Sequence, residues 1–181
     1  MSKSKLSFSH LDRYKKDFAD LFVKLSERHG RHEVWSGFIT MTACSISNSC
    51  DKQFFDEREK LYLSIAKKYT KDELEMFAQM FAIVVLALED NPEQDFLGSL
   101  FSALNLHNEW KGQFFTPEHI TKLMSEITTG KKDSTSEIQT VYDPAAGSGR
   151  ILLAAKADRP QSYLVVWDID YTCCLMCVCN F

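Results

Sequence analysis

The chain has 181 residues, of which 45% are hydrophobic and 25% are charged, and its formal net charge at pH 7 is −4. This length allows one good-sized domain or two small ones, and the composition is typical of globular rather than disordered proteins. The negative net charge excludes a basic field over the whole chain. Any contact with nucleic acid must therefore be local or come from another subunit.

The start of the chain and its apolar runs bear on its location. Met1-Ser2-Lys3-Ser4-Lys5 is not followed by the apolar segment that secretory signals have. The longest apolar run, Met80–Leu88, is too short to cross a bilayer. We therefore expect a cytoplasmic protein with no membrane partner.

The first half of the chain has the hydrophobic periodicity of helices. Apolar residues at every third or fourth position predict an amphipathic helix that Gly30 ends. An apolar stretch predicts a second helix over Val34–Ser45, and the polar character of Ser45–Gln53 predicts an irregular connection. The stripe of the first helix consists of Leu11, Tyr14, Phe18, Leu21, Phe22 and Leu25.

Three more helices are expected before residue 107. One covers Asp56–Tyr69, with Leu61, Ile65 and Tyr69 aligned. Thr70 and Glu73 have the spacing of a capping box and begin an apolar helix that Glu89–Pro92 stops. Its inward side is expected to be Leu74, Phe77, Phe81, Val84 and Leu88, and a short helix is expected over Asp95–Leu106.

The pattern changes from Gly112 onward. Thr116 suits a helix N-cap, Pro117 the first helical position and Glu118 the positive end of the helix dipole. The side of this helix expected to be buried consists of Ile120, Leu123, Met124 and Ile127.

A strand, a helix and a second strand follow a polar loop. The strands are predicted over Ile138–Tyr142 and Ser162–Trp167, the helix between them over Gly149–Ala157, and one more helix from Tyr171. Strand–helix–strand units of this length have parallel strands. The sequence therefore predicts an α/β unit behind a helical region.

The segment Asp143–Gly149 joins the first strand to the next helix through small residues. Without side chains, Gly147 and Gly149 allow close backbone approach to a ligand and positive φ angles. Unpaired N–H groups at the helix start favour acceptor oxygens. Asp143 can accept from an ammonium group or hold the turn through backbone N–H groups, and both roles remain open.

An acid at the end of the second strand completes this pattern. Asp168 lies nineteen residues after Gly149, where a carboxylate can accept from both ribose hydroxyls, and Asp170 is the near alternative. Leu152 stands where a dinucleotide fingerprint has its third glycine, which argues against a dinucleotide. A nucleoside-containing cofactor is favoured over a turn without a ligand.

These motifs resemble those of DNA adenine-N6 methyltransferases, specifically the modification-subunit branch of type I restriction–modification systems. Asp143-Pro144-Ala145-Ala146-Gly147-Ser148-Gly149 resembles the family's S-adenosylmethionine motif, and Gly112–Pro117 is similar to the motif preceding it. Asp168-Ile169-Asp170 resembles the acidic motif of the second strand, and Asp95–Phe101 the helix before Gly112. The resemblance covers residues 95 to 181.

The resemblance implies a helical N-terminal domain over residues 1–110 and the start of a Rossmann-like S-adenosylmethionine-dependent methyltransferase domain over 111–181. Phe115, Thr116 and Pro117 would line the methionine moiety, although Phe114 and Phe115 are equally suited to core packing. Asp168 would bind the ribose hydroxyls and Ile169 would pack against adenine. The implied cofactor-binding set is Phe115, Thr116, Pro117, Asp143, Pro144, Ala145, Gly147, Ser148, Gly149, Asp168 and Ile169.

Methyl transfer needs more than a cofactor site. The family holds the flipped adenine with an Asn/Asp-Pro-Pro-Tyr/Phe tetrapeptide, and the four prolines of this chain are never adjacent. We therefore assign no catalytic residue and expect part of a longer methyltransferase, inactive alone. DNA would be bound by the complete enzyme, with specificity or restriction subunits as further partners, and self-association is left open. The alternatives are a non-catalytic S-adenosylmethionine-binding or regulatory protein and a helical interaction module.

Cysteines, basic pairs and histidines offer further candidate sites. Cys174 and Cys177 form a C-x-x-C pair, but the apolar run around them and the distance to the last histidine, His119, favour buried hydrophobic residues over zinc. The pair Lys131-Lys132 is read as a solvated surface pair rather than a phosphate contact. No metal site is predicted.

Overall fold

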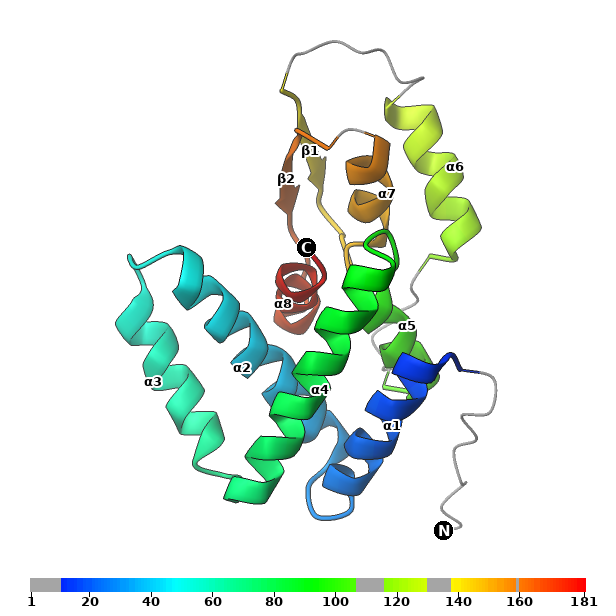
Figure 1. Ribbon diagram of the computed structural model, residues 1–181. Coiled ribbons are helices and arrows are strands. Elements are labelled where there is room, and N and C mark those ends of the chain that lie inside the picture. The colour runs from blue at the N-terminus through cyan, green and yellow to red at the C-terminus, as the bar shows by residue number, and fades with distance from the viewer. Residues whose placement is uncertain (1–10, 107–115, 130–137, 159) are drawn as a thin grey trace.

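The computed structural model of the chain describes residues 11–106, 116–129, 138–158 and 160–181. Within these ranges the fold is mostly helical, with one small parallel sheet (Figure 1). The elements are α1 (Arg13–Ser26), α2 (Arg31–Cys50), α3 (Phe55–Ala66), α4 (Lys71–Asp90), α5 (Phe96–Ala103), α6 (Glu118–Thr129), β1 (Thr140–Asp143), α7 (Arg150–Asp158), β2 (Tyr163–Val166) and α8 (Tyr171–Asn180).

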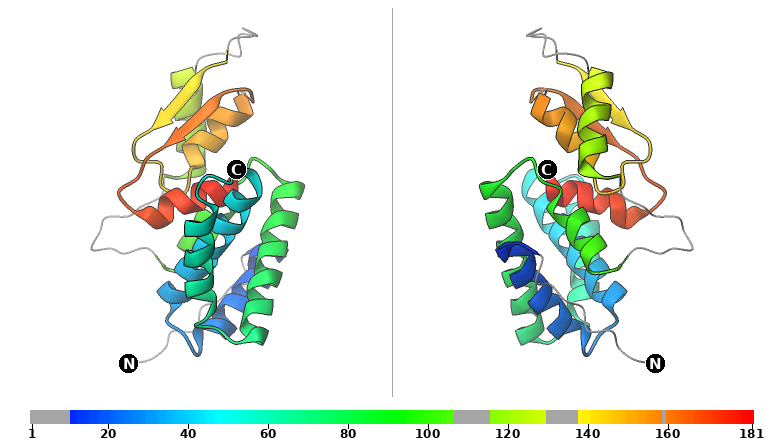
Figure 2. Two further views of the ribbon diagram at one scale, coloured as in Figure 1. Left: turned by 90° about the vertical axis from the view of Figure 1, so that its left-hand side faces the viewer. Right: turned by 90° about the vertical axis from the view of Figure 1, so that its right-hand side faces the viewer.

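The sheet confirms the predicted parallel strand–helix–strand unit. β1 and β2 pair in parallel, with Thr140 beside Tyr163 and Asp143 beside Val166. α7 covers the face that carries Val141, Leu164 and Val166, and α6 packs on α7 from the far side (Figure 2). Strands, α7 and α6 therefore form successive layers.

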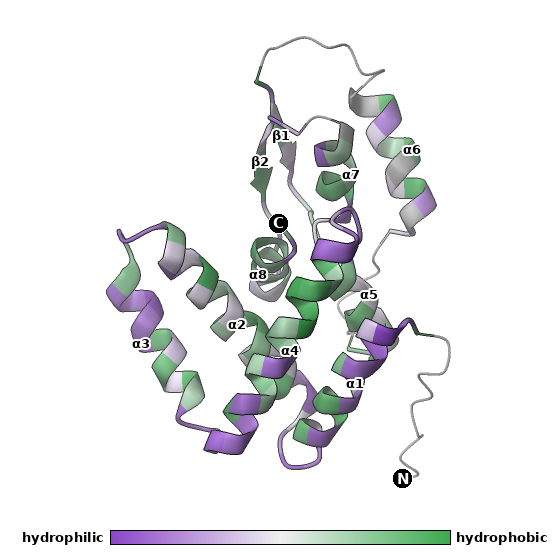
Figure 3. Ribbon diagram, viewed as in Figure 1, coloured by the Kyte–Doolittle hydropathy of each residue, from purple (hydrophilic) through white to green (hydrophobic). Residues whose placement is uncertain are grey.

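The main core lies among the N-terminal helices and is rich in aromatic rings. Phe18 of α1 makes edge-to-face contacts with Trp35 and Phe38 of α2 and with Phe96 of α5. Such arrangements place the positive ring edge against the negative face and add to the burial of the rings. α4 is hydrophobic over its central turns, whereas α3 carries many hydrophilic residues (Figure 3).

α8 connects this core to the sheet region. Cys173, Met176 and Cys179 lie in the main core, and Cys177 belongs to the second apolar cluster with Ala146 and Leu152. α8 packs mainly against α2 and also against α5, and it lies between the sheet and the lower helices in both views of Figure 2. The helix that follows β2 is thus buried on two sides.

The first two helices differ from the prediction at their boundaries. α1 ends at Ser26, and Gly30 is the N-cap of α2 rather than the end of α1. The irregular connection predicted from Ser45 is wrong, because α2 continues to Cys50. The hydroxyl groups of Ser45 and Ser49 donate to backbone carbonyls of the same helix, which satisfies them without breaking it.

The helices α3 and α4 agree better with their sequence patterns, whereas α5 ends at Ala103, three residues before the predicted end at Leu106. The capping box of α4 is confirmed: the hydroxyl of Thr70 accepts from the N–H of Glu73, and the carboxylate of Glu73 accepts from the N–H of Thr70. Phe77 and Val84 are fully buried, and the other expected inward residues of α4 are half-buried. α3 ends at Ala66, three residues before the predicted end, and Tyr69 is buried in the turn that follows.

The predicted buried side of α6 is wrong. Ile127 is 74% exposed and Leu123 52% exposed, and Ile120 and Met124 are exposed as well, whereas Thr121 and Ser125 are buried. The small polar residues allow α6 and α7 to approach closely, so the apolar stripe points outward. Periodicity predicted the stripe but not the direction in which it faces.

No helix within the described ranges is both long and apolar enough to span a membrane.

Replacing Thr70 by alanine should lower the free energy of unfolding by about 1 kcal/mol, because the first turn of α4 loses its side-chain acceptor. Chemical denaturation followed by circular dichroism measures the change. Thr70→Ser keeps the hydroxyl and should stay close to the wild type. Equal losses in the two variants would show that the methyl group, not the cap, stabilises this turn.

The six cysteines should differ in reactivity. Cys50 is exposed and Cys174 is half-buried, while the other four are buried. Burial raises the pKa of Cys179 to about 12 and also raises the pKa of Cys44 and Cys177, so these thiols stay protonated at pH 8. Alkylation at pH 8 followed by mass spectrometry should modify Cys50 first, Cys174 more slowly, and the buried four only after denaturation. Rapid labelling of Cys177 in the folded protein would contradict the position of α8.

Candidate functional site

The turn after β1 lies against the end of β2. The N–H of Trp167 donates to the carbonyl of Asp143 at 2.9 Å, and the N–H of Ala146 donates to the carbonyl of Trp167 at 3.0 Å. These bonds extend the strand pairing past both strand ends. The two carboxyl ends of the parallel strands and the start of α7 therefore meet in one place, where open α/β sheets bind their ligands.

The two glycines of the turn have backbone angles that favour glycine. Gly147 has φ 56° and Gly149 has φ 89°. A Cβ atom added at Gly149 would lie 3.0 Å from the Sγ of Cys177 and 3.0 Å from the ring of Phe181. The missing side chain of Gly149 thus gives room to α8 and the residue after it, a role that the sequence did not indicate.

The two carboxylate oxygens of Asp143 have different surroundings. Oδ1 accepts from the N–H of Ala145 at 3.0 Å and so holds the turn. Oδ2 is buried and has no hydrogen-bond partner among the described residues. Of the two roles left open for Asp143, holding the turn is observed, and the other carboxylate oxygen has no partner within the described residues.

Asp168 and Asp170 have different hydrogen-bond partners in the structure. The carboxylate of Asp168 accepts from the N–H of Gly147 at 2.8 Å and from the N–H of Asp170 at 2.8 Å. Asp170 accepts from the N–H of Thr172 and caps α8. Asp168 is therefore the acid that reaches the glycine turn. An ionised carboxylate has further lone pairs, so two backbone donors leave it able to accept more bonds.

The other predicted site residues occupy different positions around this turn. Pro144 and Ala145 are exposed, and the side chain of Ile169 is fully exposed beside Asp168. Ser148 is buried, and its hydroxyl donates to Asp95 in the interior. Phe115 lies outside the described residues, while Thr116 and Pro117 precede α6, which begins at Glu118, one residue later than expected.

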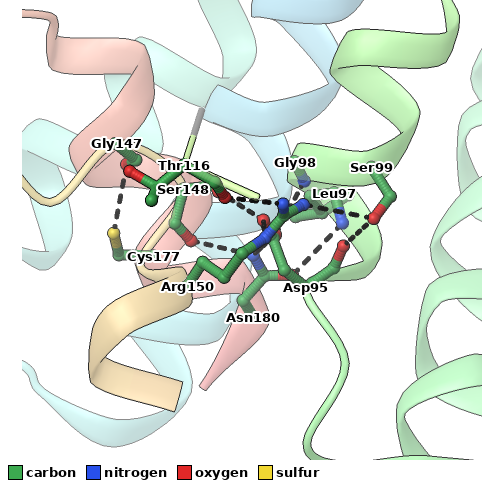
Figure 4. Close-up of polar contacts among 10 residues, drawn as sticks. All are labelled: Asp95, Leu97, Gly98, Ser99, Thr116, Gly147, Ser148, Arg150, Cys177 and Asn180. Atoms are coloured by element: carbon green, nitrogen blue, oxygen red, sulfur yellow. Dashed lines mark hydrogen bonds and ion pairs between the residues drawn. The ribbon is translucent and has the colours of Figure 1, made fainter. Parts of the chain in front are cut away.

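A buried carboxylate that sequence reasoning did not single out joins these segments. Asp95, whose side chain is 2% exposed, accepts from the N–H of Gly98, the side-chain amide of Asn180, the hydroxyl of Ser148 and the Nε of Arg150 (Figure 4). Each bond comes from a different place in the chain. One acid therefore connects α5, the glycine turn, α7 and α8.

Arg150 extends this network to the segment before α6. Its Nε lies 2.9 Å from Asp95, one terminal nitrogen donates to the carbonyl of Thr116 at 2.9 Å, and the other lies 3.4 Å from the hydroxyl of Ser99 (Figure 4). The structure thus links Thr116 to the glycine turn through one guanidinium group. In the sequence Asp95 begins both the predicted helix Asp95–Leu106 and the segment Asp95–Phe101 that resembles the family, and neither pattern indicated these contacts.

Metal binding finds no support in the described part of the chain. It contains no group of three or more histidine, cysteine, aspartate or glutamate side chains that could hold an ion. The chemistry available at the turn is that of a carboxylate pair, backbone N–H groups and an exposed apolar residue.

Part of the chain is similar to known proteins. A family model described as N-6 DNA Methylase matches residues 96–166. The methylase subunit of the type I restriction enzyme MpnII from Mycoplasma pneumoniae is 50% identical over 42 residues, which are 23% of this chain and 7% of that protein. The chain is therefore similar to N-6 DNA methylases over part of its length, and the aligned segment spans a small fraction of this relative's length. No solved structure matches the chain significantly.

Replacing Gly149 by alanine should lower the free energy of unfolding by about 1 kcal/mol or more, because the φ of 89° and the contacts with Cys177 and Phe181 both oppose a Cβ atom. Thermal and chemical denaturation measure the loss. Gly30→Ala is the matched control, since Gly30 has an ordinary φ of −65° and a Cβ added there would only reach van der Waals contact with the Cβ of Glu33 at 4.0 Å. A change at Gly149 no larger than that at Gly30 would contradict the close approach of α8.

Proposed function

We propose that the turn between β1 and α7 binds S-adenosylmethionine, and that the chain provides the cofactor-binding part of a type I modification-like DNA adenine-N6 methyltransferase. The observation that carries this proposal is the contact between Asp168 and the backbone of Gly147, which joins the acid after β2 to the glycine turn after β1. The similarity of residues 96–166 to the N-6 DNA methylase family model supports it.

The residues present fit the groups of this cofactor. The buried, unpartnered oxygen of Asp143 suits the ammonium of the methionine moiety, because a buried acceptor without a donor is costly. The remaining lone pairs of Asp168 suit the ribose hydroxyls, and the exposed side chain of Ile169 suits the face of adenine. Pro144, Ala145, Gly147, Ser148 and Gly149 form the turn between them.

The methionine end is assigned to the segment before α6. Phe115, Thr116 and Pro117 carry this role by resemblance, and Thr116 is tied to the glycine turn through Arg150. The proposal includes the division into a helical domain over 1–110 and the start of a Rossmann-like methyltransferase domain over 111–181. The parallel strand–helix–strand unit and the position of the site at its carboxyl end support this fold.

The cofactor, when bound, supplies an electrophilic methyl group for the exocyclic nitrogen of adenine. The residues described above bind and orient it by charge and hydrogen bonds. No Asn/Asp-Pro-Pro-aromatic tetrapeptide occurs among the 181 residues, so we assign them cofactor binding rather than the transfer step. DNA binding, and assembly with specificity or restriction subunits, are proposed for the complete enzyme.

Calorimetry with S-adenosylhomocysteine and its 2′-deoxy analogue tests the assignment of Asp168. Asp168→Asn should weaken binding of S-adenosylhomocysteine about tenfold, the size of one hydrogen bond to a charged group. The analogue lacks one hydroxyl, so the substitution should change its affinity much less. Wild-type protein should bind S-adenosylhomocysteine more tightly than the analogue.

Asp170→Asn is the control, because it makes the same chemical change two residues away at the cap of α8. It should affect the two ligands equally. If Asp168→Asn weakens both ligands to the same extent, the acid serves the turn and not the ribose. If the wild-type protein binds neither ligand, the proposed function is wrong.

A further inference from the structure

We propose that Arg150 is a positioning residue: seated by the buried Asp95, it holds the Thr116 segment against the glycine turn and thereby determines affinity for the methionine end of the cofactor. This inference rests on the proposed function and extends it. It assigns a role to a residue outside the predicted binding set and to an ion pair that the sequence did not indicate.

The carboxylate of Asp95 is held firmly in the interior. Its carboxylate is almost fully buried and accepts from four donors, two of them in elements far along the chain, Arg150 and Asn180. A buried carboxylate with this many partners has little freedom to turn, and removing its ion-pair partner leaves a charge without compensation. Asp95 is also the N-cap of α5, so the main helical core fixes its backbone.

The guanidinium group of Arg150 has a rigid shape. Its donors form a planar fork with fixed directions, unlike the rotating ammonium of lysine. In the structure the three nitrogens contact two segments: Asp95 and Ser99 at the start of α5, and the carbonyl of Thr116 before α6. Once Asp95 and Ser99 orient the fork, the position of the Thr116 carbonyl follows.

Arg150 also bears on the segment before α6, because the carbonyl of Thr116 accepts from its guanidinium group. The segment leads into α6, which packs on α7 while its apolar side faces outward. Arg150 is the first residue of α7, so it connects the start of this helix to the residues that lead into its neighbour α6. The distance between the glycine turn and the Thr116 segment is therefore set at Arg150.

The two ends of the cofactor are assigned to different residues. The adenosine end is assigned to Asp168 and Ile169 on the β2 side, and none of the hydrogen bonds given above joins either side chain to Arg150. The methionine end is assigned to the Thr116 segment. A change at Arg150 should thus act on one end of the ligand, whereas general loosening of the fold should act on both.

The experiment compares S-adenosylmethionine with 5′-deoxy-5′-methylthioadenosine, which has the adenosine and lacks the amino-acid part. Arg150→Lys keeps a positive charge beside Asp95 but cannot span to Ser99 and Thr116. By calorimetry on the full chain, it should weaken S-adenosylmethionine about tenfold, which corresponds to one charge-assisted hydrogen bond, and leave methylthioadenosine unchanged. Asp95→Asn, which keeps the shape of the acid, should shift the ratio of the two affinities in the same direction.

Arg58→Lys is the matched control. Arg58 also uses its three nitrogens, on Asn48 and Asp51, but at the junction of α2 and α3. It should leave both affinities unchanged. A parallel loss for both ligands in the Arg150 and Asp95 variants, or no loss in either, overturns the positioning role. A wild-type protein that binds neither ligand refutes the proposed function itself, an outcome that the wild type alone reveals.

Discussion

The buried carboxylate of Asp95 is the interaction on which the arrangement of this chain depends. Ionised groups are stable in an interior only when their partners replace water, and Asp95 has four such partners within the described residues. They bring together the end of the helical core, the turn after β1 and the last residues of α8. The side-chain amide of Asn180 also donates to the carbonyl of Ser148, which ties the turn to α8 a second time. Packing alone would join the helical core and the sheet region through α8. The hydrogen bonds of Asp95 and Asn180 define how the two regions are positioned.

The apolar contacts around the turn also join the helical core to the sheet region. α8 places Met176 in the main core and Cys177 against the cluster beneath the sheet, so a single helix belongs to both. Gly149 allows this approach because it has no side chain, and the thiol of Cys177 donates to the carbonyl of Gly147 at 3.5 Å. The back of the turn is therefore closed by α8. Its remaining open side is that of Asp143, Ala145 and Asp168, where the cofactor is proposed to bind.

Local chemistry could be predicted from the sequence, whereas contacts between distant segments could not. The capping box at Thr70 and the strand–helix–strand unit follow from spacing within a few turns, and both are confirmed. Asp168 could be ranked above Asp170 only by position; the hydrogen bond to Gly147 now distinguishes them. The partners Arg150 and Asn180 lie 55 and 85 residues from Asp95, and no periodicity carries such a relation. The predicted orientation of α6 was wrong for the same reason, since an apolar stripe in the sequence does not identify the surface that it faces.

The size of the sheet explains why polar contacts matter so much at this site. Two strands of four residues, with Tyr163 and Trp167 each 67% exposed on the face away from α7, bury little apolar surface. Parallel strands normally lie between covered faces, and hydrophobic burial then fixes their geometry. Here one face is open, so the turn is fixed by Asp143, Asp168 and Asp95 through hydrogen bonds to backbone and side chains. Because each bond has a preferred direction, these three acids restrict the orientation of the turn as well as its position. The geometry of the site should therefore respond more to the loss of one acceptor than to the loss of one methyl group beneath the sheet.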